Sequence, residues 1–177
     1  MDLVLPAEGA PFPLVAGDVG DIHRLYGAMR DHGVNRIVHC GAISGPMVME
    51  DNPYRVLEIN VVGTMNVLEA ARIQAVSRVV FLSSINAYGG SEGADPVGED
   101  QPLKAANAYG ASKVAGEAIL RAYRAEHGVD GVALRLGAIY GPRRTTTCLI
   151  RRLITDGLAG QTTRLPHGAG HYRQYTF

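Results

Sequence analysis

Tryptophan is absent from this chain of 177 residues, lysine occurs only twice, and two cysteines make no disulfide framework. The net charge is zero at pH 7 and no basic stripe is visible, so we expect no nucleic-acid partner. No apolar run approaches the length of a membrane span and no export signal is visible. We therefore expect no membrane contact and a reducing, cytoplasmic setting. We expect no metal site either.

The chain does contain a regular alternation of short apolar runs with longer amphipathic ones. The apolar runs predict strands at 13–18, 36–42, 78–84 and 131–141. The amphipathic runs predict helices at 21–33, 52–75, 107–127 and 146–160. Asn52 is a plausible N-cap for the second helix, with Pro53 in its first turn. Strands without internal polar alternation, separated by helices, predict an α/β fold with a doubly wound parallel sheet and helices on both faces.

The residues that end the predicted strands are small, polar or glycine-rich. They are Gly-Asp at 17–18, HCGA at 39–42, Ser-Ser at 83–84 and GAIYGP at 137–142. Ligands of open parallel sheets sit beyond the carboxyl ends of the strands. We therefore expect a crevice at these ends, where the protein backbone can approach a ligand closely.

One of the two lysines, Lys113, lies four positions after Tyr109 in the predicted helix 107–127. Residues four apart share one face of a helix, so both side chains can point into one crevice. A nearby ammonium stabilises a phenolate, which suits this tyrosine for proton transfer near neutral pH. A hydroxyl from a neighbouring strand end, that of Ser83 or Ser84, would hold the substrate oxygen. The Tyr–Lys spacing alone is a weak motif, so the flanking residues must show whether the pair is catalytic or a chance spacing.

Two flanking segments give the pair its context: FLSSINAYG at 81–89 and AYGASKVAGE at 108–117. They resemble the extended short-chain dehydrogenase/reductase family, which includes nucleotide-sugar epimerases and dehydratases. Further motifs similar to that family follow the same order, namely GDVGD at 17–21, VHCGA at 38–42, EINVVGTMNVLEAAR at 58–72 and LRLGAIYGPR at 134–143. The resemblance implies a Rossmann-like fold and three catalytic residues, Ser84, Tyr109 and Lys113.

The resemblance also implies a cofactor and the residues that contact it. The cofactor is NAD, with NADP not excluded. Asp2 falls where the family has its ribose-binding acid, and a carboxylate there would repel a 2′-phosphate. The other implied cofactor contacts are Asp18, Val19, Cys40, Gly41, Ala42, Asn60, Tyr109, Lys113 and Gly137. The implied substrate contacts are Ser84, Asn86, Arg143 and Arg173.

The family's glycine-rich dinucleotide turn is absent from these residues, and so is its C-terminal substrate domain. Residues 1–177 are therefore expected to be a partial NAD(P)-binding domain, with 143–177 leading into that substrate domain. The pyrophosphate of the cofactor normally rests on the helix N-terminus that follows the glycine-rich turn. We expect these residues alone to bind NAD weakly or not at all.

The function that the resemblance implies is NAD(P)-dependent oxidation or epimerisation of a sugar or nucleotide-sugar hydroxyl. Dehydration is disfavoured, because Ile85 and Asn86 stand where the dehydratases carry an acidic pair. Ala138 stands where epimerases that bind nucleotide diphosphates usually have Asn, which argues against a nucleotide-sugar substrate. Both a 4-epimerase and a simple alcohol or sugar dehydrogenase remain open. The alternative is a non-catalytic nucleotide-binding or sensor protein, or an inactive fragment.

The predicted helices 52–75 and 107–127 carry apolar residues beyond one core-facing stripe. These are Val56, Val67 and Leu68 on the first helix and Ile119, Leu120 and Tyr123 on the second. Surplus apolar surface suggests a partner. Members of the family pair through these two helices, so the resemblance implies a homodimer.

Overall fold

The computed structural model describes residues 1–3, 11–90, 96–142, 144, 146, 148–165 and 175–176. The chain divides into two compact units, Met1–Arg135 and Leu136–Phe177. In the described residues, the first unit is built around a three-stranded sheet with covering helices. The second unit contains a two-stranded pair and a helix.

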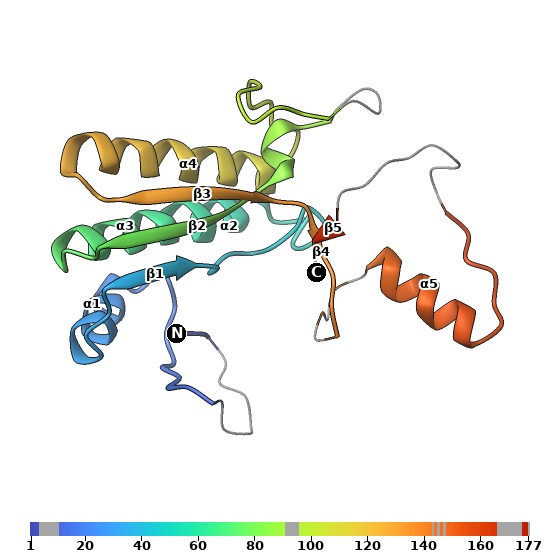
Figure 1. The fold of residues 1–177 in the computed structure, drawn as a ribbon, viewed down its shortest axis with the longest axis horizontal. Coiled ribbons are helices and arrows are strands. Elements are labelled where there is room, and N and C mark those ends of the chain that lie inside the picture. The colour runs from blue at the N-terminus through green and yellow to red at the C-terminus, as the bar shows by residue number, and fades with distance from the viewer. Residues whose placement is uncertain are drawn as a thin grey trace. The chain divides into compact units, whose positions relative to one another are not determined.

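A sheet with the strand order β1–β2–β3 forms the centre of the first unit (Figure 1). Its strands are β1 (Arg36–His39), β2 (Arg78–Ser84) and β3 (Gly131–Leu136). β1 and β2 are parallel, and their register pairs Arg36 with Arg78 and His39 with Phe81. β3 runs in the same direction as its neighbour β2 (Figure 1). The carboxyl ends of the strands therefore meet at one edge of the sheet, as the sequence predicts.

The segment predicted as the first strand, 13–18, forms a single bridge between Asp2 and Ala16. Asp2 N–H donates to Val15 O over 3.1 Å, and Gly17 N–H donates to Asp2 O over 2.9 Å. The structure thus places one bridge where the sequence predicts a strand.

Helices connect the strands, and each lies where the sequence predicts a helix except the short turn at 85–88, which the sequence does not predict. They are α1 (Ile22–Asp31), α2 (Pro53–Leu57), η1 (Glu58–Val62), α3 (Gly63–Ile73), η2 (Ile85–Tyr88) and α4 (Ala108–His127). α2, η1 and α3 form one continuous run, in which η1 is a π-helical turn. The predicted cap is confirmed, because Asn52 accepts a hydrogen bond from Arg55 N–H and Pro53 opens α2. α4 ends at His127 and is capped by Gly128, whose φ of 68° favours glycine.

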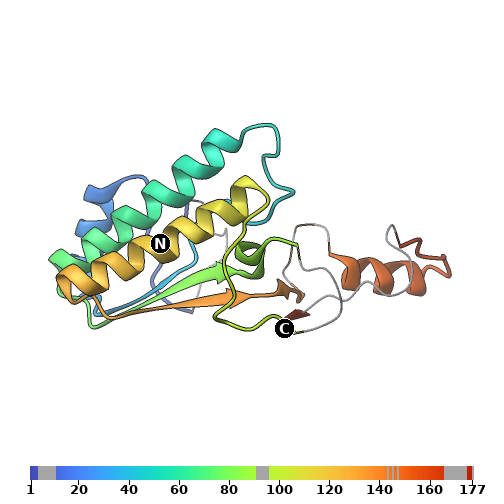
Figure 2. The same cartoon turned by 90° about the horizontal axis from the view of Figure 1, so that it is seen from above.

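Helices α1 to α4 lie on one face of the sheet (Figure 2). Val79 and Phe81 of β2 point to this face and are buried. The aliphatic side chains of Val38, Val132 and Leu134 remain exposed, and Val38 is 63% exposed. In the described part of the first unit, helices therefore cover one face of the sheet, whereas the sequence predicts cover on both.

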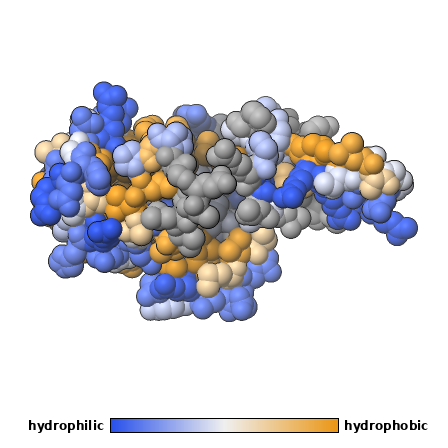
Figure 3. All heavy atoms as spheres, turned by 90° about the horizontal axis from the view of Figure 1, so that it is seen from below, coloured by the Kyte–Doolittle hydropathy of each residue, from blue (hydrophilic) through white to orange (hydrophobic). Residues whose placement is uncertain are grey.

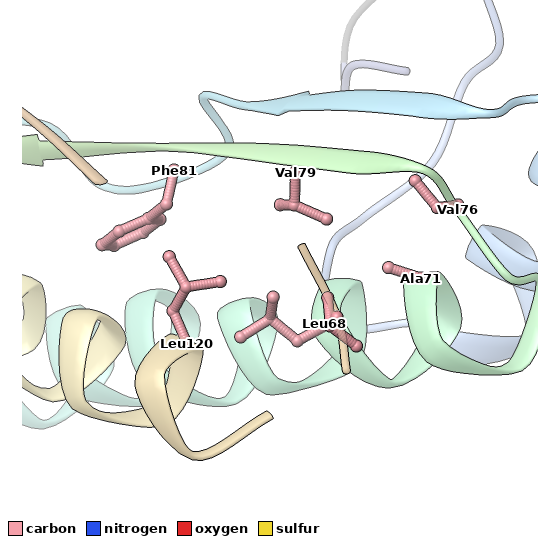
Figure 4. Packing of buried hydrophobic residues seen from close by; sticks show 7 residues of the cluster. Leu68, Ala71, Val76, Val79, Phe81 and Leu120 are labelled. Atoms are coloured by element: carbon pink, nitrogen blue, oxygen red, sulfur yellow. The ribbon is translucent and has the colours of Figure 1, made fainter. Parts of the chain in front are cut away.

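The main core lies between β2 and the helices α3 and α4 (Figure 4). Leu68 and Leu120 from the helices meet Val79 and Phe81 from the strand. Close approach here depends on Gly116, because a Cβ on that residue would lie 2.5 Å from Cζ of Phe81. A second cluster, formed by Leu25, Met29, Val67 and Ala70, packs α1 against α3.

The prediction that these helix residues form an exposed surface for a partner is wrong. Val56, Val67, Leu68 and Leu120 are all buried within the chain. Ile119 and Tyr123 are partly buried and pack against the main core. Two sequence-distant helices share one core, so each needs a wider apolar stripe than contact with the sheet alone requires.

The second unit contains β4 (Ala138–Ile139), α5 (Leu149–Leu158) and β5 (Tyr175–Thr176). β4 and β5 form a parallel pair. Figure 3 shows α5, at the right-hand end of the view, with apolar side chains along one side and polar ones along the other. None of the helices in the described ranges has both the length and the apolar content needed to cross a membrane.

Candidate functional site

Tyr109 and Lys113 lie in the first turns of α4, beside the carboxyl end of β2. The side chain of Asn107 accepts from Gly110 N–H and so fixes where the helix begins. A Cβ on Gly110 would lie 2.5 Å from Asn86 O, so the start of α4 presses directly against η2. Tyr109 and Lys113 are both buried, and Lys113 Nζ lies 5.6 Å from the centroid of the Tyr109 ring. The structure therefore brings the predicted pair together.

The ammonium of Lys113 is held against the end of β2. Its Nζ donates to Leu82 O over 2.8 Å and lies 5.0 Å from the centroid of the Phe81 ring. Burial lowers the pKa of Lys113 to about 8, although the nearby Cys40 thiol opposes the shift. An ammonium has three N–H donors, so Leu82 O leaves capacity for a bound ligand.

The two adjacent serines have different partners. Ser83 Oγ donates to the carboxylate of Glu117 over 2.6 Å and is buried. Ser84 Oγ instead caps η2, because it accepts from Asn86 N–H over 3.2 Å and from Asn86 Nδ2 over 3.1 Å. A serine hydroxyl has two acceptor sites and one hydrogen, so these contacts leave the Ser84 hydrogen available for a bound oxygen. Of the two serines, Ser83 therefore donates its hydrogen within the protein, whereas the contacts of Ser84 use only its acceptor sites.

Asn60 lies in the π-helical turn η1 and holds the loop that follows β1. Its Oδ1 accepts from Ile43 N–H over 2.7 Å, and its Nδ2 donates to Ile43 O over 3.1 Å. The same Nδ2 donates to Ser112 Oγ over 2.9 Å. Asn60 thereby ties this loop to α4 next to Lys113. A π-helical turn inside an α-helix is common at functional sites.

The turn that contains Asp18 and Val19 packs on the turn at the end of β1. Asp18 Oδ1 accepts from Gly20 N–H over 2.8 Å. A Cβ on Gly41 would lie 2.6 Å from Cγ1 of Val19, and one on Gly63 would lie 2.7 Å from Cγ2. Gly41 therefore lets the two turns meet, and Gly63 lets Val19 pack on the start of α3.

Some of the other predicted site residues have described contacts, and some lie outside the residues that the structure describes. Cys40 is a free thiol that follows β1, and its residue is exposed overall. Partial burial of its sulfur raises its pKa, and the positive charge of Lys113 only partly opposes this shift. Asp2 pairs through its backbone near Ala16. Gly137 belongs to the second unit, and Arg143 and Arg173 lie outside the described residues. Across the described ranges, no three His, Cys, Asp or Glu side chains gather in a way that could hold a metal ion.

Sequence reasoning missed two groups of residues around this site. Asn66 Nδ2 donates to Val19 O over 3.0 Å and Gly20 O over 3.1 Å, which fixes the turn of Asp18. The buried Glu117 and the partly buried Arg135 form an ion pair beside Ser83. Glu117 follows Lys113 by four positions, and that spacing is a signal that could have drawn attention to it.

His39, at the end of β1, is buried in its neutral form. Thr64 Oγ1 donates to Asn60 O over 2.6 Å, so it accepts the hydrogen of His39 Nε2 at 3.1 Å. Burial and the charge of Lys113 lower the pKa of His39 to about 4. The unfolded chain therefore takes up a proton near pH 6.5 that the folded chain resists.

We expect the free energy of unfolding to fall as the pH drops from 6.5 toward 4. This contribution is fully present above pH 6.5, and its loss amounts to at most about 3.5 kcal/mol, because the pKa is lowered from 6.5 to about 4 and one unit of pKa corresponds to about 1.4 kcal/mol. Urea unfolding at several pH values measures it. His39→Gln should flatten this part of the profile, whereas His23→Gln on the surface of α1 should leave it unchanged. Equal slopes in His39→Gln and the parent would contradict the assignment.

Comparison with known proteins gives this geometry a context. A model of the NAD dependent epimerase/dehydratase family matches residues 4–177. UDP-glucose 4-epimerase of Mycolicibacterium smegmatis is 34% identical over 170 residues, which are 94% of this chain and 54% of that protein. Uronate dehydrogenase of Pseudomonas putida is 28% identical over 171 residues, which are 94% of this chain and 60% of that protein.

The fold has a close counterpart among solved structures. UDP-glucose 4-epimerase of Thermus thermophilus, in complex with NAD, matches with a TM-score of 0.80 at 28% identity. The match covers 90% of this chain and 54% of that one. The predicted Rossmann-like α/β fold is thereby confirmed. The chain spans about half the length of the curated relatives named above.

Proposed function

Because the chain belongs to the NAD dependent epimerase/dehydratase family, we propose that it supplies the catalytic residues of an NAD-dependent epimerase or dehydrogenase acting on a sugar or nucleotide-sugar hydroxyl. One observation carries the proposal. Ser84 ends β2, Lys113 Nζ donates to Leu82 O two residues earlier on that strand, and the same ammonium lies over the Tyr109 ring.

The residues present fit NAD at three points. The carboxylate of Asp18 lies in a turn that can receive the adenine end. Gly41 lets the turn after β1 lie directly against Val19 of the Asp18 turn, and the Lys113 ammonium has donors for a ribose hydroxyl. Asn60 keeps the loop after β1 in register with α4. When bound, NAD supplies the hydride acceptor.

The side chains then have distinct tasks in the proposed reaction. Ser84 donates its hydrogen to the oxygen of the substrate carbinol and orients it. Tyr109 removes the hydroxyl proton as the carbon gives up hydride, and the neighbouring ammonium stabilises the resulting phenolate. In an epimerase the same tyrosine returns the proton after the hydride comes back to the opposite face. Asn86, Arg143 and Arg173 are proposed to contact the substrate.

Two substrate classes are supported by different observations. The UDP-glucose 4-epimerase relative supports a nucleotide-sugar 4-epimerase. The uronate dehydrogenase relative supports oxidation of a simple sugar acid, and Ala138 in place of an asparagine also favours this class. Ile85 and Asn86 in place of an acidic pair disfavour dehydration. NAD is favoured over NADP by Asp2.

Turnover assays on the full-length protein distinguish these classes. Interconversion of UDP-glucose and UDP-galactose without net NADH formation would identify an epimerase. Stoichiometric NADH formation from a uronate would identify a dehydrogenase. Binding of NAD without turnover of any hydroxylated sugar would contradict both and favour a non-catalytic nucleotide-binding protein.

We also propose that the protein forms a homodimer through its long helices. The side chains that remain exposed on the α2–α3 run differ from those that the sequence indicates. They are Tyr54, Leu57, Val62, Met65 and Ile73. Such a stretch of apolar surface on one helical run is suited to a second copy of itself across a two-fold axis.

Light scattering at micromolar concentration should give the mass of a dimer. We expect Met65→Glu to yield monomers, because it places a charge in the apolar contact. Phe12→Glu changes a residue that is 61% exposed outside these helices and should leave the dimer intact. A monomeric mass for the parent protein would contradict the proposal.

A further inference from the structure

Glu117 lies at the centre of a buried hydrogen-bond network next to the candidate site. It is 3% exposed, and it follows Lys113 by one turn of α4. Its Oε1 accepts from Ser83 Oγ over 2.6 Å and from Arg135 Nε over 2.9 Å. Its Oε2 accepts from Arg135 Nη2 over 2.7 Å. The carboxylate therefore joins the end of β2 to β3.

Arg135 extends the network to the far end of η2. Its Nη1 donates to Tyr88 OH over 2.6 Å and to Glu99 O over 2.7 Å. The guanidinium carbon lies 4.8 Å from the centroid of the Tyr88 ring. A guanidinium presents its donors in a fixed planar fork, so one side chain can set Glu117 and Tyr88 at a defined separation.

Both members of the pair are charged. Burial alone would raise the pKa of the Glu117 carboxyl, but the hydrogen bonds from Arg135 and Ser83 outweigh it and lower that pKa. The hydrogen bond to Glu117 raises the pKa of Arg135. Taking charges out of water offsets much of their attraction, so an ion pair with one buried member adds little net stability compared with apolar packing, and its value here lies in fixing geometry.

The two ends of this network bracket Ser84. Ser83 precedes it on β2, and Tyr88 ends the turn η2 that Ser84 caps. We infer that the Glu117–Arg135 pair is a positioning device, which holds both ends of η2 so that Ser84 Oγ keeps its place relative to Tyr109. The inference rests on the role proposed for Ser84. Because Asn86 O presses against Gly110, a shift of η2 would also reach the start of α4 beside Tyr109.

A first experiment measures the turn itself and needs no substrate. Tyr88→Phe removes the hydroxyl that accepts from Arg135 and keeps the ring. We expect the amides of Asn86 and Gly89 to exchange hydrogen about tenfold faster in the full-length protein, because they bond within η2. Amides in the middle of α4 should be unaffected. Tyr26→Phe on α1 is the matched control. Unchanged exchange at Asn86 and Gly89 would overturn the inference.

A second experiment tests the effect on the proposed reaction. Arg135→Lys keeps the charge but loses the planar guanidinium that contacts Glu117 and Tyr88 together. We expect kcat to fall at least tenfold while NAD affinity stays within about twofold. Arg78→Lys is the control, because Arg78 forms a surface ion pair with Asp130. A parallel loss of kcat, NAD affinity and melting temperature would mark a general structural role and overturn the inference.

The two experiments separate this inference from the proposed function. Faster exchange in Tyr88→Phe, together with no turnover of any sugar by the parent protein, would contradict the proposed function alone. Faster exchange together with a fall confined to kcat supports both.

Discussion

Tyr109→Phe should lower turnover by about a thousandfold, because general acid–base catalysis by a positioned side chain contributes roughly 10²–10⁴-fold. The change removes only the phenolic oxygen. The ring still lies beneath the Lys113 ammonium and remains packed at the start of α4. NAD affinity should therefore stay close to that of the parent protein. Initial rates on the substrate identified for the full-length protein, with a calorimetric titration of NAD, measure the two quantities separately.

The matched control for this variant is Tyr26→Phe, which removes a phenolic oxygen from α1, outside the candidate site. It should leave both the rate and NAD affinity unchanged. Full activity in Tyr109→Phe would mean that another group transfers the proton. A large loss of NAD affinity in Tyr109→Phe would mean that the hydroxyl serves cofactor binding rather than proton transfer.

Leu68→Ala should lower the free energy of unfolding by about 3 kcal/mol, within the range of roughly 2–5 kcal/mol for a buried leucine. Leu68 is 1% exposed and packs among Val79, Phe81 and Leu120, so the cavity has little room to collapse (Figure 4). Urea unfolding followed by circular dichroism measures the change.

The comparison for this core variant is Leu158→Ala, the same change in a helix at a residue that is 85% exposed. It should shift the unfolding free energy by at most about 0.5 kcal/mol. Similar losses in the two variants would contradict the position of Leu68 at the centre of the core.

Local patterns in the sequence predict the helix caps, the spacing of residues along a helix and the buried strand β2. The cap at Asn52, the stop at Gly128 and the spacing of Tyr109 and Lys113 all depend on neighbours within a few residues. The apolar run at 78–84 predicts β2 with its bounds, because a buried strand needs a continuous apolar sequence. The family resemblance drawn from these motifs is confirmed by the match over residues 4–177.

The sequence fails where contacts join distant segments. Ser83 and Glu117 are 34 positions apart, so no local pattern separates the tasks of Ser83 and Ser84. Of the helix residues predicted to meet a partner, Val56, Val67, Leu68 and Leu120 are instead buried and Ile119 and Tyr123 partly buried, because α3 and α4 share a core that only the tertiary structure defines. The site roles assigned to Ser84, Tyr109 and Lys113 stay predictions until the variants are measured.

The π-helical turn η1 makes the run from Pro53 to Ile73 sensitive to its length in residues. Such a turn holds one residue more than an α-helical turn. Deleting one residue of this turn, for example Val61, would restore α-helical winding with α2 and α3 still in register, but it would remove the widened turn in which Asn60 lies. Asn60 would then lose its hydrogen bonds to Ile43 and Ser112. Substitutions at the exposed positions of this run should be tolerated far better than any single-residue insertion or deletion within it.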